Sequence, residues 1–183
     1  MKLLILADLH LDFFLGQSMD PFRAITNEQL QGVTHCILAG DLSNKGQTQW
    51  KRCLPWLADR LPRAELFVIP GNHDYYDGCI DREDKLRDAA VAHDAGFLQK
   101  TELILGRHRF LCCTLWTDFR IFDDAAKATA RATAHMNDYQ YIRVAKEKYS
   151  KLKPAHTMRI HINHREWLQR RLSQPFDGET TVI

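Results

Sequence analysis

The chain has 183 residues, of which 45% are hydrophobic and 26% are charged, and its formal net charge is +2 at pH 7. This length suits one domain with a hydrophobic core, which we place over residues 1–183. No apolar run approaches the roughly 20 residues that a membrane-spanning helix needs, so we expect no membrane association. The amino terminus shows no small-residue cleavage site of a secretory signal, and we therefore predict a cytoplasmic protein.

The cysteines and the charge distribution exclude some kinds of site. The five cysteines are odd in number and include no Cys-x-x-Cys pair, which argues against a disulfide framework and a zinc–cysteine site. We expect them to be reduced and mostly buried. Residues 126–171 contain eleven Lys and Arg residues but three acidic ones. Such a segment can attract phosphate-bearing ligands, although a basic helix surface is more often simply solvated.

Three short apolar runs in the first half of the chain each end in a polar cluster. They span residues 3–10, 36–41 and 66–74, and their unalternating apolar character predicts buried parallel strands. We expect helices between them, over about 21–31 and over 47–61. Pro55 would kink or restart the second helix. Strands that alternate with helices indicate an α/β fold.

The second half of the chain is predicted to begin with a helix over 82–94 and a hairpin over 101–116 that turns at Gly106-Arg107. Residues 122–153 are rich in Ala, Lys and Arg, which predicts helix. Because this helix would have little apolar face, we expect residues 122–158 to form a helical excursion from the domain or a lid.

A further helix is expected over 159–172. Its apolar residues at helical spacing should face the core; they are Ile160, Trp167, Leu168 and Leu172. The stretch 179–183 predicts the start of another strand.

The polar clusters at the three strand ends hold residues that bind metals. Asp8 and His10 follow the first strand, Asp41 follows the second, and the third is followed by Asn72, His73 and Asp74. The carboxyl ends of strands in an open α/β sheet meet at one edge, where ligands bind. Carboxylate, imidazole and carboxamide donors suit divalent ions such as Mn, Fe, Zn or Ni. Each motif alone fits an ordinary turn better than a metal site, but their conjunction at three successive strands indicates a metal site.

The three motifs resemble those of a known family. Asp8-x-His10, Gly40-Asp41 and Gly71-Asn72-His73-Asp74 are similar to the first three motifs of the calcineurin-like metallophosphoesterases. The stretches 111–119 and 136–143 also resemble bacterial phosphoesterases. The resemblance implies a four-layer α/β/β/α sandwich, which we expect to be incomplete at the carboxyl terminus.

The resemblance also implies the roles of the site residues. Asp8, His10 and Asp41 would bind a first metal ion, and Asp41 with Asn72 would bind a second.

In the same resemblance, His73 would contact the phosphate and protonate the leaving group, while Asp74 would orient His73 by a hydrogen bond.

Two motifs of the family pattern do not occur in the sequence. They are a strand that ends in histidine and a Gly-His-x-His, and the chain contains no Gly-His pair. We therefore expect one moderately bound ion and a second that binds weakly or not at all. His156, His161 or His164 could supply further ligands, although packing or surface roles fit them better. An exposed sheet edge would favour a homo-oligomer.

Three functions follow from these observations. The leading one is a metal-dependent phosphoesterase that hydrolyses phosphate monoesters or diesters through a metal-activated water. The second is a catalytically impaired family member that binds a phosphate ligand or a protein. The third is a nuclease, for which the basic segment argues; it ranks last because no aromatic residues are interleaved with the basic ones.

Overall fold

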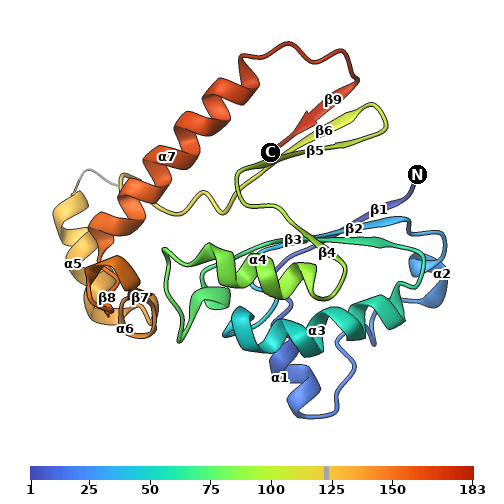
Figure 1. Cartoon of the computed structure of the whole chain (residues 1–183), viewed down its shortest axis with the longest axis horizontal. Helices are drawn as coiled ribbons and strands as arrows, with labels where there is room; N and C mark the ends of the chain where they lie inside the picture. The colour runs from blue at the N-terminus through green and yellow to red at the C-terminus, as the bar shows by residue number, and fades with distance from the viewer. Residues whose placement is uncertain (122–123) are drawn as a thin grey trace.

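The computed structural model describes residues 1–121 and 124–183. Two main β-sheets face each other with helices on the outside (Figure 1), and a third sheet has two short strands. The first sheet is parallel, with strand order β1-β2-β3-β4. Its strands are β1 (Leu3–Leu6), β2 (His35–Ala39), β3 (Glu65–Ile69) and β4 (Ala95–Phe97). The three predicted strands are confirmed, each ending before its polar cluster. The sequence did not reveal β4, because three residues are too short for a strand pattern.

Helices α3 (Gly46–Arg60) and α4 (Glu83–Val91) cover the outer face of this sheet (Figure 1). Both were predicted. The apolar face of α3 is completely buried at Trp50, Cys53, Leu54 and Leu57, which anchors the helix to the sheet. The helix continues through Pro55 and does not restart there.

The predicted helix over 21–31 is wrong. Residues 21–24 form turns, and only α2 (Asn27–Leu30) is helical. The helix begins at a capping box, in which the Thr26 side chain accepts from the Gln29 backbone and the Gln29 side chain accepts from the Thr26 backbone. This box starts a new, short helix and separates it from the preceding turns. A helix not predicted, α1 (Leu11–Gly16), follows β1 directly.

The second sheet contains β5 (Thr101–Leu105), β6 (His108–Cys112) and β9 (Thr180–Val182). Strands β5 and β6 form the predicted hairpin, which turns at Gly106 with a left-handed φ of 61°. The predicted strand that starts at 179 is also confirmed; β9 pairs in parallel with β6. Strand β6 ends at Cys112, earlier than expected.

Apolar side chains pack against one another between the two sheets, namely Ile37, Leu98, Leu105, Phe110 and Cys112. Helix α7 (Pro154–Leu172) lies on the opposite face of the second sheet. From that face Glu102 pairs with Arg171, and the Arg109 guanidinium donates to the carbonyl oxygens of Arg171 and Gln174. The layers are therefore α/β/β/α, as the sequence motifs implied.

Helix α7 confirms the helix expected over 159–172 and begins five residues earlier. Leu168 is buried and Ile160 packs against the core, as predicted. The prediction is wrong for Leu172, which is 45% exposed because it lies in the last turn of the helix.

Residues 125–152 form two helices and a small hairpin. These are α5 (Ala125–His135), α6 (Asp138–Tyr141), β7 (Arg143–Val144), the 3-10 turn η2 (Ala145–Glu147) and β8 (Ser150–Lys151). The expectation of helix up to 153 is therefore wrong after Tyr141. Ile142, Val144 and Leu152 are buried in the hydrophobic core, and burial of their apolar side chains stabilises the hairpin against it. The first two residues of the proposed excursion, 122 and 123, lie outside the described residues.

This segment packs on the loop that follows β3. The backbone nitrogens of Asp77 and Ile80 donate to the carbonyl oxygens of Tyr141 and Arg143.

All five cysteines are free; Cys36, Cys53 and Cys112 are buried, and the other two are half-buried. No helix in the described part of the chain combines the length and apolarity needed to cross a membrane.

Candidate metal centre

The chain segments that leave β1 and β2 run side by side. The backbone nitrogen of Asp8 donates to the backbone carbonyl oxygen of Gly40 at 3.1 Å. The backbone nitrogen of His10 donates to the backbone carbonyl oxygen of Asp41 at 3.1 Å. Asp8, His10 and Asp41 all adopt left-handed backbone conformations, with φ of 53°, 44° and 51°. Such conformations are strained for residues other than glycine and concentrate at functional sites.

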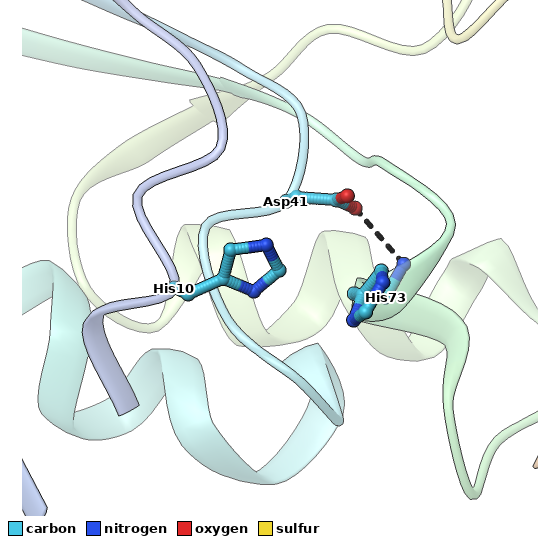
Figure 2. A group of neighbouring side chains, drawn as sticks. All are labelled: His10, Asp41 and His73. Carbon is cyan, nitrogen blue, oxygen red and sulfur yellow. Dashed lines mark hydrogen bonds between the residues drawn. The ribbon is translucent and has the colours of Figure 1, made fainter. Parts of the chain in front are cut away.

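Three side chains meet where these strands end, as Figure 2 shows for His10, Asp41 and His73. Each offers one metal-binding atom, and these atoms all lie within 4.8 Å of one another. We call these three residues the donor cluster. The rings of His10 and His73 meet edge to face, with centroids 4.7 Å apart. The Oδ1 atom of Asp41 also accepts a hydrogen bond from the backbone nitrogen of His73 at 2.9 Å.

The donor cluster fits a divalent cation. Two imidazoles and a carboxylate are donors that Mn, Fe and Zn accept. Burial raises the pKa of the Asp41 carboxyl, while the hydrogen bond and the positive character of His73 and His10 oppose this shift. A bound cation would stabilise the ionised carboxylate further.

Of the other predicted metal ligands, Asp8 lies outside the donor cluster, and Asn72 offers a carboxamide oxygen. Both line the same cleft as Asp41, with a volume of about 760 Å³. The cleft continues between the two sheets, where its walls are apolar. The Nδ2 atom of Asn72 donates to Oδ1 of Asp138 at 2.8 Å.

Asn44 orients His73. The Nδ1 atom of His73 lies 2.8 Å from Oδ1 of Asn44, whose own Nδ2 donates to Asp12 at 3.0 Å. Because the Asn44 amide nitrogen is held by a carboxylate, its oxygen accepts from His73, which places a proton on Nδ1. Asp12 and Asn44 were missed from the sequence. They lie two residues after His10 and three after Asp41, but no sequence pattern singles them out.

The expected hydrogen bond between Asp74 and His73 is not formed. Asp74 is buried, and its carboxylate accepts from the backbone nitrogens of Gly71 and Ser43 and from Nε1 of Trp50. Burial raises the pKa of Asp74 to about 7, although these three hydrogen bonds oppose the shift. The carboxylate thus ties the third motif to the segment after β2 and to α3.

Gly71 is required by the close approach of two segments. A Cβ atom built on Gly71 would lie 2.1 Å from Oδ1 and 2.4 Å from the backbone nitrogen of Asp41. Glycine therefore allows the loop after β3 to pass directly against the Asp41 carboxylate.

The later histidines occupy different places. His156 contacts Glu147 at 3.0 Å, and the Nδ1 atom of His164 accepts from the backbone nitrogen of Leu115. Both are buried in these contacts, which agrees with the packing role expected for them. His161 lines the cleft together with Asp118, and their side chains are 3.7 Å apart.

Two facing sheets, with candidate metal ligands at the carboxyl ends of the first three strands, define an α/β metallophosphoesterase fold. The chain belongs to the calcineurin-like phosphoesterase family, whose sequence profile it matches over residues 1–181. The family binds divalent metals, and its substrates are phosphate esters.

Among solved structures, the chain is similar to the phosphopantetheinyl hydrolase from Mycobacterium tuberculosis. The TM-score is 0.61 at 18% sequence identity, and the match covers 99% of this chain and 67% of the other. At this identity the likeness shows the shared fold alone. Comparison with curated protein sequences gave no significant match.

Proposed function

We propose that this protein hydrolyses phosphate monoesters or diesters with the help of a divalent cation held at the carboxyl ends of β1, β2 and β3. The observation that carries the proposal is the donor cluster, in which His10, Asp41 and His73 converge within 4.8 Å. Membership in the calcineurin-like phosphoesterase family supports it.

In this proposal, His10 and Asp41 hold the cation, and Asp8 and Asn72 complete the ligand set from the same cleft as Asp41. The third member of the donor cluster, His73, stays unligated beside the cation, where it can contact the phosphate. When bound, the cation supplies a Lewis acid that polarises the phosphate and activates a water molecule. In the same proposal, Asp41 would be the ligand shared by the two cation sites.

His73 has the role of general acid. With Nδ1 held by Asn44, Nε2 is the nitrogen left to face the substrate, and the Tyr76 hydroxyl lies 3.4 Å from it. A protonated His73 can then donate from Nε2 to the leaving-group oxygen without losing its orientation. The loop anchored by Asp74 carries His73 next to Asn72, which lines the cleft.

Hydrolysis of 4-nitrophenyl phosphate and bis(4-nitrophenyl) phosphate tests the proposal. We expect turnover that depends on added Mn²⁺ and is strongly reduced in Asp41→Asn. The matched control is Asp88→Asn, which changes an exposed carboxylate on α4. Turnover of one substrate and not the other would also separate monoesterase from diesterase. Absence of metal-dependent hydrolysis, with Asp41→Asn like the wild type, would overturn the proposal.

The alternative is a family member that binds a phosphate ligand without turnover, since the sequence contains no Gly-His-x-His motif. Metal analysis separates the two. Two ions per chain favour the enzyme, and none favours the binding protein.

Four narrower expectations stay predictions: manganese as the ion, a cytoplasmic location, association of copies along the edge of β9, and nuclease activity. Sedimentation velocity tests the association. Nuclease activity requires binding to DNA that weakens steeply with salt.

A further inference from the structure

A buried carboxylate outside the three strand-end motifs contacts the site. Asp138 lies at the start of α6, and only 2% of its surface is exposed. Its Oδ1 atom accepts from Nδ2 of Asn72 and from the hydroxyl of Tyr76, each at 2.8 Å. A residue 66 positions further along the chain thus binds the side chain of a proposed metal ligand.

This contact decides which atom Asn72 presents to the cleft. A carboxamide can turn either its oxygen or its nitrogen outward, and only the oxygen binds a cation. A carboxylate accepts hydrogen bonds and donates none. If the Asn72 amide were reversed, its oxygen would face the Asp138 oxygen. Asp138 therefore holds Nδ2 and leaves Oδ1 of Asn72 for the cleft, which Asn72 lines.

The same carboxylate oxygen restrains His73 through Tyr76. The Tyr76 ring stacks on the imidazole of His73, with centroids 4.4 Å apart. The Tyr76 hydroxyl, which donates to Asp138, lies 3.4 Å from Nε2 of His73. One carboxylate is thus connected to two adjacent residues of the site.

The environment of the second oxygen of Asp138, Oδ2, is what a nearby cation would explain. Within the described residues, Oδ2 is buried and has no hydrogen-bond partner, and Asp138 forms no salt bridge. Buried charges are normally paired or lie close to metal ions, because removal from water is costly. Positive charge in the adjacent cleft would offset that cost.

We propose that Asp138 is a positioning residue, which fixes the Asn72 carboxamide with its oxygen toward the cleft and thereby strengthens cation binding at Asn72. The inference deepens the proposed function, but it concerns metal affinity and does not need turnover. It also assigns a function to residues 125–152, because α6 in this segment positions the Asp138 carboxylate beside Asn72.

Calorimetric titration with Mn²⁺ alone tests the inference. Asp138→Ala is expected to weaken Mn²⁺ binding about 10- to 100-fold, as is usual for residues that orient metal ligands. Asp138→Asn keeps an acceptor oxygen and should restore part of that loss. A purely electrostatic role predicts equal losses in the two variants, and equal losses would overturn the positioning role.

The matched control is Asp81→Ala. Asp81 accepts from the backbone nitrogens of Ala145 and Lys146 and so anchors the same segment, but it does not contact Asn72. We expect it to lower the melting temperature and leave Mn²⁺ affinity within about twofold. If Asp81→Ala weakens binding as much as Asp138→Ala, the segment acts only as a scaffold and the inference is wrong.

A measurement on the wild type remains decisive if Asp138→Ala does not fold. NMR should show slow solvent exchange of the Asn72 side-chain amide protons, and fast exchange contradicts the inference.

Failure of the proposed function can be distinguished from failure of the positioning role of Asp138. Weaker Mn²⁺ binding in Asp138→Ala, without phosphoester turnover in the wild type, supports the positioning role and rejects the enzyme. A wild-type protein that binds no Mn²⁺ overturns both.

Discussion

The Nδ1 atom of His73 lies 2.8 Å from the Oδ1 atom of Asn44. Asp12 holds the amide nitrogen and the backbone nitrogen of Asn44, at 3.0 and 3.1 Å. The three residues follow β3, β2 and β1, respectively, so the ends of three neighbouring strands together set the orientation of one imidazole. A histidine that must donate from Nε2 needs this restraint at Nδ1.

Asn44→Ala should therefore lower kcat for a phosphoester about 10- to 100-fold and change KM little, because His73 loses the acceptor that fixes its ring. Steady-state kinetics with Mn²⁺ measures both constants. Asn27→Ala, at an exposed position of α2, is the control. If kcat is unchanged in Asn44→Ala, the orientation of His73 by Asn44 does not contribute to catalysis and the prediction is wrong.

Asp74→Ala should act on stability. It removes the acceptor of three buried donors, the backbone nitrogens of Gly71 and Ser43 and the Trp50 indole. Each buried donor left unpaired costs about 1–3 kcal/mol, so we expect a loss of at least about 3 kcal/mol in the free energy of unfolding. Urea denaturation measures it. Asp84→Ala removes an exposed partner of Arg82 and should change stability by less than about 1 kcal/mol.

Gly71→Ala should displace the Asp41 carboxylate, because the added Cβ would overlap both its Oδ1 atom and its backbone nitrogen. We expect Mn²⁺ affinity to fall about tenfold or more. Gly16→Ala is a suitable control, since nothing lies within 4 Å of a Cβ at that position. Titration calorimetry on both variants checks the expectation. Equal affinities would mean that Asp41 does not bind the ion.

The sequence predicted the strand ends better than the contacts between them. Asp8, His10 and Asp41 were identified because each follows an apolar run, and that pattern is local. Asn44 and Asp138 were not, because their partners are 29 and 66 positions away in the chain. No local pattern distinguishes such residues from a turn residue or a solvated helix start.

The role of Asp74 was misassigned for a related reason. Its neighbour in sequence is His73, but the 3-10 turn η1 (His73–Tyr75) directs the two side chains to different partners. The helix expected over 21–31 failed because Asp20-Pro21 is also a good turn start, and the Thr26 capping box competes with it. Tertiary contacts, such as the Asp20–Arg60 ion pair, decide between these local alternatives.

His164 should make the stability of the protein depend on pH. It is buried in α7, and burial lowers its pKa from 6.5 to about 4. Between these values the unfolded chain binds a proton at His164 and the folded chain does not. Stability therefore increases with pH across this window. The contribution is complete above about pH 6.5 and is lost as the pH falls toward 4, by up to about 3 kcal/mol.

His164→Asn tests this dependence, because Asn can still accept from the backbone nitrogen of Leu115 but does not titrate. Urea unfolding between pH 4 and 7 should show a flatter stability curve for His164→Asn than for the wild type. His135→Asn, at an exposed position in the last turn of α5, should leave the curve unchanged. If the wild-type and His164→Asn curves run parallel, His164 is protonated in the folded protein as readily as in the unfolded chain, and burial does not control its titration.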